Sequence, residues 1–380
     1  MKTAVVILNW NTEGFLRDFL PGLISSVEKV DGAEVIVADN ASTDNSLKVM
    51  QEEFPAVKTI AFDKNYGFTG GYNKAFEALY GTAESPKEDA PEYFLLINSD
   101  IEVSDGWLQP LVSWMDGHPH CGACAPKLHS WQDREMFEYA GAAGGYLDCF
   151  GYPFCRGRIL SRLEKDEGQY DTPADVLWAT GACLLVRSSV YAQLGGLDDR
   201  FFAHMEEIDL CWRMQLEGWK VTVVPESIVY HVGGGTLPAS SPFKTFLNFR
   251  NNLLMLENNL ARTYALMYFK QDKSLESAAR KGLRKANRRI STRRILDGLA
   301  CMAYMFTGKG KLAEAVEQAG AEYLKLRQPV SSENIVEYLK TFGTTASVRG
   351  IYGKSMVLES LMRKDKVFKA IKEKDFYKIG

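Results

Sequence analysis

Long apolar segments are absent from this sequence of 380 residues. No window holds the roughly 20 uninterrupted apolar residues that a membrane-spanning helix needs. The N-terminus runs directly into a β-branched segment at Val5–Leu8, without the longer apolar stretch and small-residue cleavage site of a signal peptide. The seven cysteines are an odd number and widely spread, which is typical of reduced thiols in a reducing compartment. We therefore expect a globular protein of the cytoplasm.

Two common nucleotide-binding motifs are also missing. No G-x-G-x-x-G follows the first predicted strand, which argues against a nicotinamide dehydrogenase or a methyltransferase with that loop. No G-x-x-x-x-G-K-[ST] phosphate loop occurs either. The 13 prolines and 32 glycines are too few and too scattered for a fibrous or low-complexity chain. With 46% hydrophobic and 24% charged residues, the composition is that of a folded protein, and the length suggests two to three domains.

The formal net charge of −3 hides a strong asymmetry between the two parts of the chain. Residues 1–243 contain 18 Lys and Arg against 35 Asp and Glu, a net charge of −17. Residues 244–380 contain 27 against 13, a net charge of +14. Such a division indicates two regions with different partners, although chance clustering of solvated charges is the simple alternative.

Short β-branched runs alternate with segments of helical spacing in the first hundred residues. The runs are Val5–Leu8, Val35–Ala38, Val57–Phe62 and Tyr93–Ile97. This order predicts an α/β fold with a buried, mostly parallel sheet and helices on both faces. Further strands are expected within 175–186, at 221–225 and at 228–231, with a helix near 188–194.

The character of the sequence changes at about Pro242. Lys, Arg, Leu, Ala and Glu at helical spacing dominate from there on, with breaks near 307–310, 328–332 and 343–353. We therefore divide the chain into an α/β domain at 1–242 and a basic, α-helical C-terminal region at 243–380.

Polar side chains follow four of the predicted strands at their carboxyl ends. The four segments are Asn9-Trp10-Asn11, Asp39-Asn40-Ala41-Ser42-Thr43-Asp44, Asn65 to Asn73, and Asn98-Ser99-Asp100. Ligands of open parallel sheets bind at this edge, so we expect these side chains to converge and to hydrogen-bond a nucleotide. The alternative for Asp39 and Asp44 is a turn or helix-capping role, which Asp44 in particular fits.

Five blocks in this order resemble the family 2 glycosyltransferases, in particular their bacterial rhamnosyltransferase-like branch with the GT-A fold. The blocks are 6–11, 37–44, 65–73, 95–100 and 181–231, and the resemblance covers roughly residues 3–260. It implies a GT-A sheet of nucleotide-diphospho-sugar transferases, with a nucleotide-sugar half at about 1–100 and an acceptor half at about 101–242. The helical region matches only loosely.

The resemblance implies roles for single residues. Asp39 would accept a hydrogen bond from the base of a uridine or thymidine diphosphate sugar. Asn9 and Asn11 would lie beside the base and ribose, and Asn65 and Asn73 near the nucleotide and the sugar.

A divalent metal ion is implied in the same way. Asp100 corresponds to the last acidic residue of a D-x-D motif that holds the cation against the diphosphate, although Asn98 replaces the first Asp. His231 would complete the metal shell, and such ligands suit Mg²⁺ or Mn²⁺. A second register, Asp100-Ile101-Glu102, would restore two acids, and a buried structural histidine is the alternative for His231.

The candidate general base lies among Glu206, Glu207 and Asp209. The resemblance places Glu207 at the base position, while Glu206 and Asp209 would position the acceptor or the helix. An inverting displacement needs one such base to deprotonate the acceptor hydroxyl. An acidic first helical turn, favoured by the helix dipole, is the alternative. The Gly- and aromatic-rich segment 131–158 would line an acceptor cleft or form a packed insertion.

These expectations describe an inverting, metal-dependent glycosyltransferase. It would move a sugar from a UDP- or dTDP-sugar, dTDP-rhamnose included, to a hydroxyl of a glycan or lipid-linked acceptor in cell-surface polysaccharide synthesis. One alternative is a catalytically degenerate protein that binds nucleotide sugar or a partner, motivated by Asn98 and Glu207. A second is a sugar-1-phosphate nucleotidyltransferase, although no basic Gly-rich loop follows the first strand.

The helical region contains a strongly basic segment. Residues 270–294 hold ten basic side chains, opposed only by Asp272 and Glu276. One predicted stripe is Arg280, Arg284 and Arg288; an adjacent one is Lys281, Lys285 and Arg289. We expect this segment to dock peripherally on the anionic inner face of the cell membrane, near a lipid-linked acceptor, rather than on nucleic acid. A solvated face or a homo-oligomer contact is the alternative.

Overall fold

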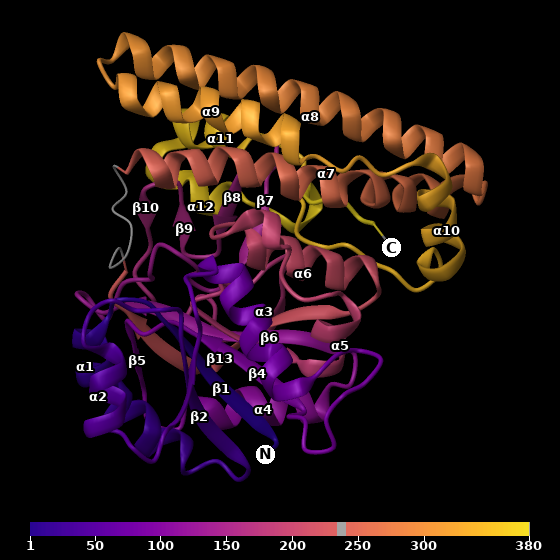
Figure 1. The fold of residues 1–380 in the computed structure, drawn as a ribbon. Helices are drawn as coiled ribbons and strands as arrows, with labels where there is room; N and C mark the ends of the chain where they lie inside the picture. Colours follow the sequence, from indigo (N-terminus) through magenta and orange to yellow (C-terminus); the bar gives the residue numbers. More distant parts are fainter. Residues whose placement is uncertain (234–240, 380) are drawn as a thin grey trace. The chain divides into compact units, whose positions relative to one another are not determined.

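The computed structural model describes residues 1–233 and 241–379, apart from the side chain of Asp365. The chain divides into two compact units (Figure 1). The first contains Met1–Gly145, Cys155–Phe202 and Lys220–Gly233. The second contains Tyr146–Phe154, Ala203–Trp219 and the described residues beyond Gly233. The sequence prediction made a single cut at 242, whereas the chain enters the second unit three times.

A mixed, mostly parallel sheet organises the first unit. Its strands are β1 (Thr3–Asn9), β2 (Ala33–Asp39), β3 (Lys58–Ala61), β4 (Tyr93–Ile97), β5 (Ile101–Val103), β6 (Cys121–Ser130), β11 (Ala174–Asp175), β12 (Cys183–Arg187) and β13 (Lys220–His231). The order is β11-β13-β6-β12-β4-β1-β2-β3, with β5 paired to β13. Strands β4, β1, β2 and β3 run parallel, while β12 is antiparallel to both neighbours. The four predicted N-terminal strands are confirmed, and the two expected late strands form one strand with a register shift between Val223 and Ile228.

Two layers of helices cover this sheet. They are α1 (Glu13–Val27), α2 (Ser46–Glu52), α3 (Gly67–Tyr80), α4 (Leu108–Gly117) and α5 (Ser188–Gln193). Odd-numbered side chains of β1 and β4 pack with Leu16 of α1 and Leu111 of α4 in one buried core. On the other face, Phe94 of β4 meets Phe76 of α3 and Tyr191 of α5. The alternation follows from the two-residue period of a strand, and it confirms the prediction of a sheet between helices.

A smaller sheet has the order β10-β9-β8-β7. Its strands are β7 (Gly145–Leu147), β8 (Pro153–Cys155), β9 (Arg158–Ile159) and β10 (Arg162–Leu163). Strands β7 and β8 lie within 131–158, the segment for which the sequence predicts either a cleft lining or a packed insertion; β9 begins at the last residue of that segment and β10 lies beyond it.

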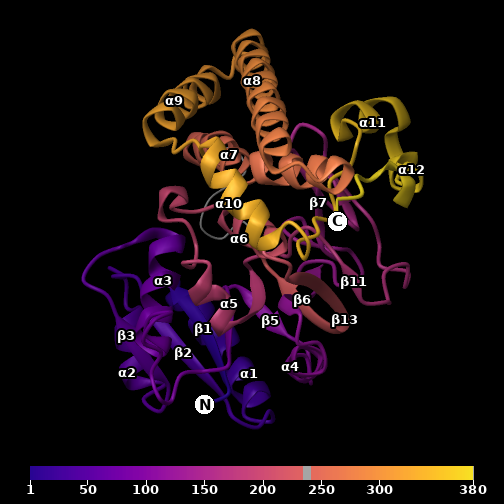
Figure 2. The same cartoon turned by 90° about the vertical axis from the view of Figure 1, so that its right-hand side faces the viewer.

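The second unit is mostly α-helical, and its described residues beyond 242 confirm the predicted helical C-terminal region. Its helices are α6 (Glu206–Leu216), α7 (Pro242–Asp272), α8 (Leu275–Phe306), α9 (Gly310–Leu326), α10 (Ser332–Phe342), α11 (Met356–Arg363) and α12 (Val367–Ala370). Helices α7, α8 and α9 pack against one another, and α10 packs on α7 and α8 (Figure 2). All three predicted breaks fall between helices. None of the described helices combines the length and apolar character that crossing a membrane requires.

The two predicted basic stripes of α8 have different surroundings. Arg280, Arg284 and Arg288 are exposed. In the second stripe only Lys281 is exposed; Lys285 lies with its Nζ 4.4 Å from the ring centroid of Tyr264 on α7, and Arg289 packs at 5.5 Å from the ring of Phe150. The stripe of Lys281, Lys285 and Arg289 is therefore not a solvated face, because packing on α7 and on the turn at Phe150 turns Lys285 and Arg289 inward.

The crossing of α7 and α8 depends on a glycine, which gives a stability prediction. A Cβ on Gly282 would lie 2.5 Å from the backbone nitrogen of Ala265, so the helices could not keep their distance. We expect Gly282→Ala to lower the free energy of unfolding by about 1 to 3 kcal/mol in urea denaturation. Gly298→Ala on the same helix is the matched control: nothing lies within 4 Å of its added Cβ. It should raise stability by about 0.5 to 1 kcal/mol through helix propensity. Equal gains from both substitutions would contradict the close crossing.

Candidate nucleotide-sugar site

The parallel pairing of β1 with β2 sets Asn9 directly beside Asp39. The Asn9 Nδ2 donates to Asp39 Oδ2 at 2.8 Å and to the Ser42 hydroxyl at 3.1 Å. The Asp39 Oδ1 accepts from the backbone N–H of Ser42 at 2.8 Å. Both side chains are buried. The side chain of Asp39 is thus held at the strand end by the amide of Asn9 and the turn at Ser42, and its oxygens have lone pairs remaining for a further donor.

Asn11 belongs to the same strand-end group. Its backbone has φ of +55°, a left-handed conformation that Asn tolerates better than most residues. Its side-chain oxygen accepts from the backbone N–H of Thr43 at 2.7 Å, while its own N–H donates to Ser42 at 2.9 Å. The loops after β1 and β2 are therefore tied together, as expected for neighbouring parallel strands.

Asn65 is connected to the strand-end residues by a hydrogen bond with Asn40, a residue that sequence reasoning did not single out. The Asn40 Nδ2 donates to Asn65 Oδ1 at 3.0 Å and to the Gly67 carbonyl at 2.9 Å. Its Oδ1 accepts from the Tyr66 N–H at 2.9 Å. Asn40 thereby links the end of β2 to the start of α3. The signal for it was its place directly after Asp39.

Asn73 lies elsewhere on α3, and both of its amide atoms are engaged. Its Nδ2 donates to the Leu197 carbonyl and to Asp199, each at 2.8 Å. Its Oδ1 accepts from the Tyr191 hydroxyl at 2.7 Å and from the Leu197 N–H at 3.0 Å. These hydrogen bonds attach the segment around Leu197 to α3, the helix that carries Asn73. We therefore expect Asn73 to position this segment rather than to contact the sugar.

Asp100 and His231 are brought together by the antiparallel pairing of β5 with β13, in which His231 opposes Ile101. The His231 Nε2 lies 3.2 Å from Asp100 Oδ1. Its Nδ1 lies 3.3 Å from Oε1 of Glu138, although the N–H is not aligned for a hydrogen bond. All three side chains are buried. Glu138 is a member of this cluster that the sequence did not reveal, since no motif or periodicity marks it within 131–158.

The cluster is electrostatically coupled. Burial opposes a charged imidazole, yet the contacts with Asp100 and Glu138 raise the pKa of His231 to about 10. Burial likewise opposes ionisation of Asp100, but the interaction with His231 prevails and lowers the pKa of that carboxyl below its ordinary value. A positive charge between carboxylates is thus favoured at this position, whether it is a proton or a cation.

The second register for the metal motif would use Glu102, whose carboxylate already has two partners. The side chain of Glu102 accepts from Trp131 Nε1 at 2.7 Å and forms an ion pair with Arg134 at 2.8 Å. The Glu102 carboxylate is therefore engaged by Trp131 and Arg134, whereas the Asp100 carboxylate lies 3.2 Å from His231.

A metal ion here would need ligands from its substrate. Among the described side chains, no group of three or more His, Cys, Asp and Glu is arranged to hold a metal. Asp100 and His231 place one carboxylate oxygen and one imidazole nitrogen within 3.2 Å, close enough to share one cation. Diphosphate oxygens and water would have to supply the remaining ligands, as Mg²⁺ usually requires.

The acidic segment of α6 belongs to the second unit and follows a strained turn. His204 and Met205 have φ of +69° and +74°. The Asn251 Nδ2 holds this turn by donating to the carbonyls of Ala203 and His204, both at 2.7 Å. Strained backbone held by side-chain hydrogen bonds is a common feature of functional sites.

Three buried polar atoms within this turn have no hydrogen-bond partner among the described residues. They are His204 Nε2, Glu206 Oε2 and Glu207 Oε2. Burial, followed by the charge of Glu207, raises the pKa of Glu206 well above its usual range. Burial raises the pKa of Glu207 to about 7. A carboxyl with a pKa near neutrality is suited to general-base chemistry.

Asp209 lies one turn further along α6 and is fully satisfied. Its Oδ1 accepts from Asn258 at 2.9 Å and from Asn259 at 2.8 Å, while Oδ2 accepts from Arg213 at 2.7 Å. The side chain has no exposed surface. Asp209 thus ties α6 to α7, which supports its predicted role in positioning the helix.

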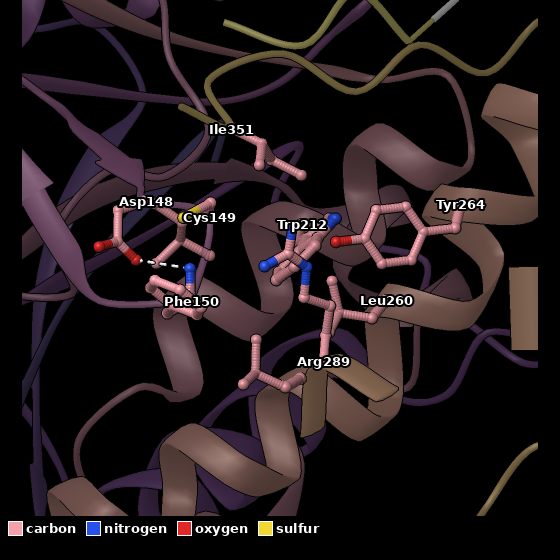
Figure 3. A pocket seen from close by; sticks show the side chains of 11 residues that line it. Asp148, Cys149, Phe150, Trp212, Leu260, Tyr264, Arg289 and Ile351 are labelled. Carbon is pink, nitrogen blue, oxygen red and sulfur yellow. Dashed lines mark hydrogen bonds between the residues drawn. The ribbon is translucent and has the colours of Figure 1, made fainter. Parts of the chain in front are cut away.

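A small cavity lies near these helices within the second unit. Asp148, Tyr264 and Arg289 are among its lining side chains (Figure 3). Its volume of about 10 Å³ is room for a single water molecule, far less than a nucleotide requires. The Asp148 carboxylate there accepts from the N–H groups of Phe150 and Tyr152 at 2.8 and 2.9 Å. The cavity is therefore a packing feature of the helical unit.

The contrast between Asp209 and Glu206 gives a stability prediction. Asp209→Ala removes the acceptor of three hydrogen bonds and half of a buried ion pair, so we expect the free energy of unfolding to fall by about 3 to 5 kcal/mol. Glu206→Gln, its control, removes a carboxyl that has an unpartnered buried oxygen and should leave the unfolding midpoint unchanged or raise it. Urea denaturation followed by circular dichroism compares the two. A wild-type midpoint for Asp209→Ala would exclude the positioning role.

Comparison with known proteins gives relatives that are similar to part of this chain. An N-acetylglucosaminyl-diphospho-decaprenol L-rhamnosyltransferase of Mycobacterium tuberculosis is 28% identical over 237 residues, which are 60% of this chain and 75% of the relative. The rhamnosyltransferase WbbL of Escherichia coli K12 is 24% identical over 227 residues, covering 60% of this chain and 82% of the relative.

The fold also has a counterpart of known structure. The crystal structure of GalNAc-T7 with UDP, GalNAc and Mn²⁺ superposes with a TM-score of 0.52 at 18% identity, over 76% of this chain and 54% of that chain. At this identity the likeness concerns the fold alone, and it confirms the GT-A architecture. The sequence model described as glycosyl transferase family 2 matches residues 4–195, about half of the chain. The chain therefore belongs to the family 2 glycosyltransferases.

Proposed function

We propose that this glycosyltransferase is metal-dependent and inverting, and that it moves a sugar from a UDP- or dTDP-sugar to a hydroxyl of a glycan or lipid-linked acceptor. The observation that carries the proposal is the buried strand-end constellation of Asn9 and Asp39, together with the Asp100–His231 pair in the same unit. The rhamnosyltransferase relatives support dTDP-rhamnose as a donor and cell-surface polysaccharide synthesis as the setting. Family membership does not support the nucleotidyltransferase alternative.

The donor would be recognised by groups that are already in place. The Asp39 carboxylate, oriented by Asn9 and Ser42, would accept from the N–H of a uracil or thymine base. Asn11 and the loop at Thr43 would border the base and ribose. Because these side chains are held by one another, little side-chain entropy would be lost on binding.

Asp100 and His231 would hold a divalent cation, Mg²⁺ or Mn²⁺, against the diphosphate. Such an ion offsets negative charge on the departing nucleoside diphosphate. Glu138, on the other side of the imidazole, would keep His231 oriented. The missing first acid at Asn98 would make this cation depend on the bound diphosphate for its affinity.

Glu207 would act as the general base. Its carboxylate would take the proton of the acceptor hydroxyl, whose oxygen then attacks the anomeric carbon while the bond to the diphosphate breaks. Burial raises the pKa of Glu207 to about 7, so this carboxyl can take up and release a proton near neutral pH. Glu206, with a pKa raised further, would remain protonated and could donate to the acceptor.

One face of α8 supports contact with a membrane. Its exposed side chains are basic in the first half and apolar in the second, with spacings of three, four or seven residues: Arg280, Arg284, Arg288, Ile295, Leu299, Met302 and Phe306. A cationic surface is attracted to anionic lipid by about 1 kcal/mol per nearby Lys or Arg. Peripheral association at the inner face of the cell membrane would bring the enzyme to a lipid-linked acceptor.

Metal dependence has a direct test with a matched control. Asp100→Ala should abolish release of nucleoside diphosphate from a panel of nucleotide sugars in the presence of acceptor, with an unchanged circular dichroism spectrum. EDTA should do the same to the wild type, and Mn²⁺ or Mg²⁺ should restore it. Glu102→Ala, which affects only the pair with Arg134 and Trp131, should retain activity. Full activity in EDTA would refute the metal role of Asp100 and His231; no turnover with any donor, despite donor binding, would favour the degenerate alternative.

The base assignment predicts both a rate and a pH profile. Glu207→Gln should lower kcat by about 10²- to 10⁴-fold, since a positioned base is lost, with little change in donor affinity. Only the ionised carboxyl accepts a proton, so the wild-type kcat should rise with pH through about 7 and then level off. This rise should vanish in Glu207→Gln. A larger loss in Glu206→Gln or Asp209→Asn would show that the base lies elsewhere on α6.

A further inference from the structure

A second cationic surface lies at the C-terminal end of the described chain, within the helical unit. A cavity of about 560 Å³ is lined by five lysines and one arginine, with Asp375 as the single carboxylate among its described lining residues. We call it the C-terminal basic pocket. Its size is in the range of small-ligand sites. Over 354–375 the sequence has seven cations and four carboxylates, so the pocket gathers positive charge more strongly than the segment as a whole.

Most of the cations in this pocket are available to a ligand. Lys354 pairs with Asp375 at 2.9 Å, and Arg363 pairs with Glu359 of α11. Lys366, Lys369 and Lys372 form no ion pair with any described side chain, and all three are exposed. Several lysines around one concavity repel one another in the absence of an anion. An anionic group that enters relieves this repulsion, and a lysine binds phosphate as a point charge.

An apolar patch adjoins the pocket along α11. Leu358, Leu361 and Met362 are 57%, 69% and 70% exposed and share one face of the helix at spacings of three and four residues. Met362 directly precedes Arg363 of the pocket lining, and α11 packs on α12, which carries Lys369. Exposed apolar side chains beside a cationic concavity match a surface with anionic groups above an apolar layer.

We propose that the C-terminal basic pocket binds the phosphate of an anionic phospholipid headgroup, and that Leu358, Leu361 and Met362 enter the apolar boundary of the same bilayer. A free phosphate would satisfy the lysines but leaves the three apolar side chains in water. The lipid surface accounts for both features. The site is distinct in sequence from the exposed face of α8, and it does not depend on which sugar is transferred.

Vesicle co-sedimentation of the full chain tests this. Wild-type protein should pellet with vesicles of phosphatidylcholine mixed with phosphatidylglycerol, and remain in the supernatant with phosphatidylcholine alone. The triple variant Lys366→Gln, Lys369→Gln, Lys372→Gln should bind the anionic vesicles on the order of 100-fold more weakly. Lys29→Gln, Lys48→Gln and Lys58→Gln, exposed lysines of the first unit combined in one protein, make the control of equal charge change. This control should bind as the wild type does.

Two further sets of measurements distinguish a lipid phosphate from free phosphate, and the C-terminal basic pocket from the exposed face of α8. Leu358→Ser, Leu361→Ser, Met362→Ser should also weaken vesicle binding, and inorganic phosphate should not displace the wild type at equal ionic strength. If inorganic phosphate binds in calorimetry and displaces the vesicles while the serine variant binds normally, the pocket is a free-phosphate site and the lipid proposal is overturned. If only Arg280→Gln, Arg284→Gln, Arg288→Gln loses vesicle binding, the α8 face acts alone and the pocket proposal fails. Neither of these results would affect the proposed glycosyl transfer, which is measured separately by donor turnover in solution.

Discussion

The register of the parallel strands is the constraint on which the candidate nucleotide-binding edge of the sheet depends. Because β1 and β2 pair residue for residue up to Asn9 and Asp39, the amide of one reaches the carboxylate of the other at 2.8 Å. A slip of one residue would turn one of these side chains to the opposite face of the sheet. The apolar alternation that buries Val5 and Val37 against one helical layer fixes this register. Core packing and ligand geometry are therefore set by the same pattern.

Much of this could be predicted from the sequence, because the relevant signals are local. The run Tyr93–Ile97 was identified as a strand to the residue, since it is apolar, short and bounded by polar residues. The gathering of Asn9, Asn11 and Asp39 followed from a general rule on parallel sheets, and hydrogen bonds between their loops bear it out. The helix breaks were marked by Gly and Pro. No comparable signal gives the register of the antiparallel β5 and β13, on which the proximity of Asp100 and His231 depends.

What escaped prediction depends on contacts between residues far apart in the chain. Glu138 reaches His231 from a segment without periodicity, so no pattern marks it. Asn251 holds the turn before Glu206 from a different helix, 48 and 47 residues along the chain from the two carbonyls that it bonds. The inward orientation of Lys285 and Arg289 was missed for another reason: a helical wheel places charges on a face but does not show what packs on that face. Aromatic rings of the same unit lie against their charged groups, a placement of cationic side chains that composition cannot reveal.

The first turns of α6 show how one helix can hold acids for opposite purposes. Asp209 receives three hydrogen bonds, two of them from α7, so its charge is compensated and stabilises the helix pair. Glu206 and Glu207 are also carboxylic acids of the same helical turn, yet each has a buried oxygen without a hydrogen-bond partner among the described residues. Leaving such oxygens unsatisfied costs about 1 to 3 kcal/mol each, and the strained turn before them adds to this. Folding alone would not select this arrangement, whereas a base whose carboxyl must gain and lose a proton near neutral pH requires it. The stability lost at Glu207 therefore supports the proposal that this carboxyl, rather than Asp209, takes part in the chemistry.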